Sequence, residues 1–188
     1  EGGGGGREMV RDGLITRWQI DEVYAMHNMP GIAVGHFAIR PGAIMAAADQ
    51  FEIVVTGKGG HAAKPQDCID PLVAAAQMIV SLQTIASRSV DPLKEVVVSV
   101  CVIETDSVAH NVIPQVVTMK GTVRSMNPKV QDLVEDRLTR IIAGTALAFG
   151  VKADLTYRRG YPVTVNTPAN TGYAIVVADA VSGKVDPD

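Results

Sequence analysis

Apolar and polar residues alternate along several segments in the middle of the chain, and this alternation predicts β-strands. In segment 51–56 every second residue is large and apolar, as in a strand with one buried face. Segments of the same kind predict further strands at 95–104, 115–124 and 151–158. Within 115–124, Arg124 falls on the polar face, so we expect its side chain on an open face of the sheet.

Apolar residues at helical spacing predict two long helices between these strands. Each helix opens with a capping residue followed by proline, at Asp70-Pro71 and at Asn127-Pro128. The first is expected to run to about Arg88 and the second to stop at Gly150. The resulting order is β-α-β-β-α-β, which is the ferredoxin-like arrangement of an α+β domain with both helices on one face of an antiparallel sheet.

The flanking segments predict less regular structure. Local patterns favour a short helix at 7–14, strands at 21–26 and 32–39, and a helix at about 169–181. The last helix has little to pack against inside a ferredoxin-like unit. We therefore expect the flanks to be two pieces of a second, α/β domain into which that unit is inserted. The predicted domains are 1–48, 49–160 and 161–188.

Composition excludes several classes of function. The chain has 188 residues, of which 47% are hydrophobic and 20% charged, as in a soluble globular protein. Its net charge of −3 argues against nucleic acid or an anionic membrane as a partner. No apolar run approaches the length of a membrane span, and Cys68 and Cys101 form no CxxC pair. A cytoplasmic location is the expectation.

The loop 57–65 is the first candidate for chemistry. It reads GKGGHAAKP and joins a predicted strand to a predicted helix. Glycines allow a close approach to the backbone, and His61 can move a proton or donate to an oxyanion near neutral pH. The alternative interpretation is a tight turn with a solvated histidine, and the loop alone does not decide between them.

Asn111 and Arg124 complete a set of groups that suits a polar substrate. Taken singly, Asn111 in the irregular connection 105–114 is a turn residue and Arg124 a solvated strand residue. With His61 they provide a ring donor, an amide and a guanidinium. These groups can bind a carbonyl oxygen and a carboxylate.

Glu1 and His27 are the remaining residues with metal-ligand chemistry. His27 precedes a Pro-Gly turn at the end of a predicted strand, where ligands gather in α/β folds. A structural histidine is the alternative, and for His36 that interpretation is preferred. Two ligands do not make a metal site.

Motifs along nearly the whole chain resemble one family. They are EGGGGGREMV at 1–10, MHNMPG at 26–31, GKGGHAAKP at 57–65, VDPL at 90–93, NVIP at 111–114, GTVR at 121–124 and YRRGYP at 157–162. In this order they are similar to the amidohydrolase branch of the di-metal aminoacylase and carboxypeptidase family, which includes hippurate hydrolase and plant indole-acetyl-amino-acid hydrolases.

The resemblance implies a role for each candidate residue. Glu1 resembles the metal ligand of a Glu-Glu pair, and His27 resembles a second ligand to two divalent metals, which in this family would be Zn, Mn, Co or Ni. His61 resembles the histidine that reaches into the partner's active site and stabilises the tetrahedral oxyanion. Asn111 and Arg124 resemble residues that bind the substrate carbonyl or carboxylate. The implied partners are an N-acyl amino acid and a second copy of the chain.

Parts of the family pattern are missing from these residues. The upstream ligands, the general-base Glu and the last His are absent, so we expect a central fragment that retains no metals and is inactive alone. A non-catalytic dimerisation or amino-acid-binding module is the alternative, and an exopeptidase acting on dipeptides also remains open.

Overall fold

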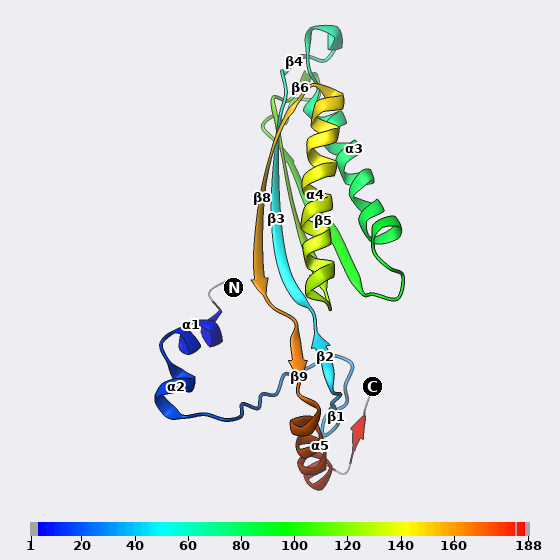
Figure 1. Ribbon diagram of the computed structural model, residues 1–188. Coiled ribbons are helices and arrows are strands. Elements are labelled where there is room, and N and C mark those ends of the chain that lie inside the picture. The colour runs from blue at the N-terminus through cyan, green and yellow to red at the C-terminus, as the bar shows by residue number, and fades with distance from the viewer. Residues whose placement is uncertain (1–3, 183, 187–188) are drawn as a thin grey trace. The chain divides into compact units, whose positions relative to one another are not determined.

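The computed structural model describes residues 4–182 and 184–186 (Figure 1). The chain divides into two compact units, one formed by 45–164 and the other by 1–44 with 165–188. None of the helices within the described residues combines the length and apolar character needed to cross a membrane.

The unit 45–164 contains a four-stranded antiparallel sheet covered on one face by two helices. The sheet has the order β5-β7-β3-β8, and the predicted β-α-β-β-α-β order is confirmed. Figure 1 shows α3 and α4 side by side along this sheet. The elements are β3 (Ala47–Thr56), α3 (Pro71–Thr84), β5 (Val96–Thr105), β7 (Val116–Ser125), α4 (Pro128–Phe149) and β8 (Lys152–Tyr161), with a π-helical turn η2 (Ile85–Ser89) after α3.

Both long helices begin where the capping residues predicted. The Asp70 carboxylate accepts a hydrogen bond from the backbone N–H of Leu72 (2.8 Å), and the Asn127 side chain accepts one from Lys129 (2.8 Å). Helix α4 ends at Gly150, whose φ of 68° is the left-handed conformation that glycine adopts most easily. Local chemistry therefore fixes these boundaries.

The core lies between the helices and one face of the sheet. On β7, alternate residues Val117, Met119 and Val123 are at most 1% exposed, and Arg124 is exposed on the other face as predicted. The helices contribute residues at helical spacing. The largest fully buried side chains include Ile53, Met78, Leu82, Ile85, Leu138 and Ile142.

The flanking unit is less regular than the sequence predicted. Segment 21–26 forms no strand, and of 32–39 only a two-residue strand remains. Val23 and Met26 are 71% and 86% exposed, because no neighbouring strand in the described residues pairs with this segment. The elements are α1 (Gly5–Arg11), α2 (Leu14–Trp18), β1 (Phe37–Ala38), β2 (Gly42–Met45), β9 (Thr164–Asn166), α5 (Pro168–Ser182) and β10 (Val185–Asp186).

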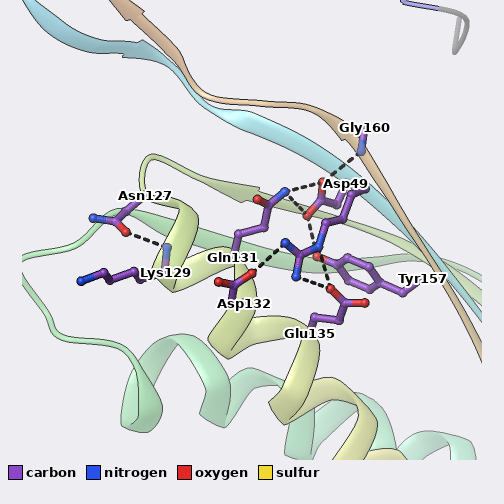
Figure 2. A network of polar contacts seen from close by, with 9 residues as sticks. Asp49, Asn127, Lys129, Gln131, Asp132, Glu135, Tyr157 and Gly160 are labelled. Atoms are coloured by element: carbon purple, nitrogen blue, oxygen red, sulfur yellow. Dashed lines mark hydrogen bonds and ion pairs between the residues drawn. The ribbon is translucent and has the colours of Figure 1, made fainter.

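A buried carboxylate ties α4 to two strands of the sheet. Asp49 is 1% exposed and accepts hydrogen bonds from the Gln131 amide (2.9 Å to each oxygen) and the Tyr157 hydroxyl (2.7 Å). It also accepts one from the backbone N–H of Gly160 (3.1 Å). Figure 2 shows these groups converging from α4 and β8 on one side chain of β3. A buried charge is stable here because polar donors surround it.

Gly160 is the extra residue of a β-bulge in β8. The register moves from Ala48 opposite Tyr161 to Asp49 opposite Arg159, which leaves Gly160 without a partner across the ladder. A Cβ atom at this position would collide with the carbonyl oxygen of Ala48. The bulge therefore requires glycine, and the Asp49 carboxylate satisfies its free N–H.

We expect Asp49→Ala to destabilise the chain strongly. It removes the acceptor of the buried Gln131 amide, the half-buried Tyr157 hydroxyl and the Gly160 N–H, which should lower the free energy of unfolding by about 3 kcal/mol. The matched control is Asp132→Ala, which removes an acidic side chain that is 64% exposed and paired with Arg159. The control should cost less than about 1 kcal/mol in urea unfolding. Equal losses in both variants would contradict the role assigned to Asp49.

The Tyr157 hydroxyl should make stability depend on alkaline pH. Burial and the hydrogen bond to Asp49 raise the pKa of Tyr157 well above its ordinary value of 10.0. Above pH 10 the unfolded chain loses this proton while the folded chain keeps it, so the free energy of unfolding should fall by about 1.4 kcal/mol per pH unit from this group. Tyr157→Phe should lack this component in unfolding curves measured between pH 9 and 11. An unchanged slope in the variant would refute the assignment.

Candidate functional site

His61 lies on a short two-stranded ribbon at one end of the sheet (Figure 1). Strand β4 (Gly60–His61) pairs antiparallel with β6 (Val112–Ile113), and His61 is opposite Val112. The preceding glycine is needed because a Cβ at Gly59 would lie 2.8 Å from the carbonyl oxygen of Ile113. The ribbon is followed by the 3-10 turn η1 (Pro65–Asp67). The loop thus holds His61 in a defined place.

The imidazole of His61 is exposed, and one of its nitrogens already accepts a hydrogen bond from the backbone. The backbone N–H of Ala63 donates to Nδ1 (3.1 Å), so Nδ1 is the acceptor of the neutral ring. The ring proton is therefore on Nε2, which is left to donate outward. This tautomer suits a group that stabilises a negatively charged oxygen.

Asn111 lies on the opposite side of the same ribbon, one residue before Val112, the partner of His61. Its backbone carbonyl accepts a hydrogen bond from the N–H of Ala62 (3.0 Å), while its side chain is exposed. A cavity of about 310 Å³ adjoins the ribbon and is lined in part by Gly60, Ser107 and Pro114. The structure therefore brings two of the predicted site residues together.

Arg124 lies on the open face of the sheet near the end of β7. It is exposed, and within the described residues no hydrogen bond or ion pair holds its guanidinium. It lines a second cavity of about 450 Å³, together with residues of β3 and of the segment after β8. An unpaired guanidinium beside a cavity is suited to bind a carboxylate.

The structure separates Arg124 from the other two residues. The ribbon with His61 lies near Val116, which pairs with Thr56 at the end of β3, whereas Arg124 pairs with Ala48 near its beginning. Eight residues of extended β7 separate Val116 from Arg124, or about 27 Å at the usual rise of a strand. One copy of the chain therefore cannot place His61 and Arg124 on the same small substrate.

The predicted metal ligands do not form a metal centre here. Glu1 lies outside the described residues, and His27 is an exposed loop residue rather than the end of a strand. Its Nδ1 donates to the carbonyl oxygen of Asn28 (2.6 Å), which leaves Nε2 as the atom that would bind a metal. In the part of the chain that the structure describes, no three His, Cys, Asp or Glu side chains gather to hold an ion.

Asp49 and Tyr161 were not among the predicted residues, although both shape the region around Arg124. Asp49 shares the buried face of β3 with Phe51 and Ile53, so a charge on an apolar face was the available signal. Tyr161 depends on the bulge at Gly160, and a glycine at the end of a strand pattern was the available signal for that bulge.

Comparison with known proteins places this geometry in a family. The family model described as the peptidase dimerisation domain matches residues 47–148, more than half of the chain. The N-acetyl-L-cysteine deacetylase of Bacillus subtilis (strain 168) is 40% identical over 172 residues, which cover 92% of this chain and 41% of that protein. The hippurate hydrolase of Campylobacter jejuni is 36% identical over 184 residues, covering 98% of this chain and 48% of that protein.

Solved structures agree with these relatives. An aminohydrolase from methicillin-resistant Staphylococcus aureus superposes with a TM-score of 0.87 at 29% identity, over 98% of this chain and 48% of that one. The Bacillus subtilis YXEP protein, described as a dinuclear metal binding peptidase of the M20 family, gives 0.74 at 26% identity, over 98% and 46%. The chain spans about half the length of its relatives. The resemblance drawn from the motifs is confirmed, and the chain belongs to the M20 peptidase family, whose dimerisation domain it carries at residues 47–148.

Proposed function

We propose that this chain is part of a metal-dependent amidohydrolase that cleaves the amide bond of N-acyl amino acids. The names of two relatives, an N-acetyl-L-cysteine deacetylase and a hippurate hydrolase, support this reaction class. The observation that carries the proposal is the pair of unengaged donors, the Nε2–H of His61 and the guanidinium of Arg124. In this scheme 49–160 is a satellite domain, and 1–48 with 161–188 belong to a catalytic domain.

Each donor has a task in amide hydrolysis. Attack on the amide carbon converts the carbonyl oxygen into an oxyanion, and the Nε2–H of His61 donates to it. The Asn111 amide contacts the substrate carbonyl. Arg124 binds the amino-acid carboxylate through two parallel hydrogen bonds, which fixes the scissile bond relative to His61.

The catalytic metals have to be held mainly by other parts of the protein. Of the proposed ligands only His27 lies within the described residues, and a single imidazole does not hold a metal pair. We propose that the 188-residue chain alone neither retains two divalent ions nor hydrolyses the substrate.

The edge strand β5 is the surface that we propose for a homodimer. From Val96 to Ile103 it carries no charged residue, and Val97 and Ile103 are 51% and 47% exposed. The opposite edge, β8, carries Lys152, Asp154 and Arg158, charges of the kind that block strand pairing. Helix α3, which packs near β5, adds exposed Val73 and Val80.

A two-fold pairing of β5 with its copy would bring His61 of one subunit toward Arg124 of the other. Strands related by a two-fold axis run antiparallel, so the end of one sheet that carries His61 and Asn111 lies beside the Arg124 end of the other. Each active site would then draw His61 and Asn111 from one subunit and Arg124 from its partner.

A charge on the β5 edge should break the dimer. We expect Ile103→Lys to shift the chain from about twice 19.8 kDa toward 19.8 kDa in light scattering coupled to size exclusion. The matched control is Thr156→Lys, which adds the same charge to the exposed edge strand β8. Dissociation caused by the control alone would place the interface on the other edge.

Loss of the His61 imidazole should reduce turnover. In the longer protein that contains this chain, we expect His61→Ala to lower kcat on hippurate by roughly a hundredfold or more, because one donor to the oxyanion is removed. His110→Ala removes an exposed imidazole beside Asn111 and is expected to leave kcat within about twofold. A loss below about threefold in His61→Ala would exclude the oxyanion role.

Mixing two inactive variants separates a shared site from a site within one subunit. In the longer protein that contains this chain, a heterodimer of His61→Ala and Arg124→Gln subunits keeps one site in which both residues are intact, if they come from different subunits. Activity should therefore return on mixing. Failure to recover activity, with heterodimers verified by native mass spectrometry, would contradict the cross-subunit arrangement.

A further inference from the structure

The cavity beside Arg124 is organised by one row of residues across the sheet. Val97, Arg124, Ala48 and Tyr161 lie opposite one another on β5, β7, β3 and β8. Side chains in such a row project from the same face of the sheet. Strands β7 and β8 lie on either side of β3, so the backbones that carry Arg124 and Tyr161 are about two strand spacings apart, roughly 10 Å. Ala48 lies between them and has only a methyl group, which leaves this space open. The cavity of about 450 Å³ is lined by Arg124, Ala48 and Tyr161 from this row.

Tyr161 takes part in this row only because of the bulge. Arg158 is opposite Gln50 on the open face, and regular alternation would place Gly160, not Tyr161, next on that face. The extra residue Gly160 moves Tyr161 into the position opposite Ala48. The buried Asp49 carboxylate holds that bulge through the Gly160 N–H. The core network therefore aims an aromatic ring at the cavity, a known use of bulges near binding sites.

The charge at this end of the open face favours an anion. Arg124 has no partner within the described residues, whereas Arg158 lies one row away and outside the cavity lining. The adjoining open-face positions hold Thr122 and Gln50, which are uncharged. Further along this face, the carboxylate of Glu52 has the Lys120 ammonium 3.7 Å away. A carboxylate placed at Arg124 meets no repulsion in its own row.

Apart from Thr164, the rest of the lining is apolar. Met45, Ala46, Pro162 and Val163 complete the wall beside Tyr161, and Tyr161 is 54% exposed. An aromatic ring and aliphatic groups around a single guanidinium match a small molecule with one carboxylate and an attached apolar group. The volume is within the range of ligand sites.

We propose that this cavity is a side-chain subsite for an amino-acid unit with an apolar side chain: Arg124 binds its carboxylate, and Tyr161, Met45 and Val163 contact its side chain. Ala48 sets the size of the side chain that fits. This inference rests on the proposed function in that it names the amino-acid half of the substrate. The binding step requires neither metal nor hydrolysis.

The test is a titration of the isotope-labelled 188-residue chain with N-acetyl-L-phenylalanine, followed by NMR. We expect saturable shifts at the amides of Ala48, Tyr161 and Val163. N-acetyl-L-phenylalaninamide, which lacks the carboxylate, and N-acetylglycine, which lacks the side chain, should each bind roughly tenfold more weakly.

Three variants test separate parts of the site, and a fourth serves as a control. Arg124→Gln should weaken N-acetyl-L-phenylalanine roughly tenfold, and Tyr161→Ala should do the same while leaving N-acetylglycine unchanged. Arg158→Gln is the matched control, since it removes the same charge from the neighbouring row outside the cavity lining, and its affinity should stay within about twofold of the original. Ala48→Leu should block binding by filling the gap.

Several results would overturn the inference. They are equal affinity for the acid and its amide, an equal loss in Arg158→Gln and Arg124→Gln, or no saturable binding at millimolar concentrations. Hydrolysis by the longer protein is a separate measurement. Binding without hydrolysis by the longer protein would contradict the proposed function but support the subsite. Hydrolysis that is insensitive to Tyr161→Ala would support the proposed function but contradict the subsite.

Discussion

The hydrogen bonds to the Asp49 carboxylate are the interaction on which the rest of this structure depends. They join a glutamine on α4, a tyrosine on β8 and the free N–H of a bulge at one buried side chain of β3. Because the carboxylate itself is withdrawn from water, these donors are its means of hydrogen bonding in the core. One carboxylate thus fixes both the contact between α4 and the sheet and the path of β8. Because the bulge in β8 decides which residue joins the open face, the core network also shapes that face.

Much of the ferredoxin-like unit follows from short-range sequence patterns. Strand β7 was predicted because Val117, Met119 and Val123 alternate with polar residues, and α3 and α4 because a cap and a proline precede each apolar repeat. The prediction for 21–26 was wrong because its composition suits a strand while no partner strand is present in the described residues. Strand formation depends on a neighbour, and a local pattern does not include the neighbour.

The candidate site was predictable only in part for the same reason. The glycines around His61 and the polar face of Arg124 are local features, and they indicated these two segments as candidates. The distance between these two residues and the juxtaposition of Ala48 with Tyr161 arise from strand register over more than a hundred residues. Register is set by the whole sheet, so local sequence patterns could not reveal the cavity, and a second copy was expected only from the resemblance to a family.

The bulge at Gly160 has a consequence for how this fold can diversify. The atom that excludes a side chain at this position belongs to the backbone of Ala48, so no exchange of a neighbouring side chain could compensate for losing the glycine. Met45, Tyr161 and Val163, which line the cavity, are exposed or half-buried. A lineage could therefore exchange Met45, Tyr161 or Val163 while the frame that presents them stays constant. Substrate preference and folding stability would then evolve as separate properties of the same sheet.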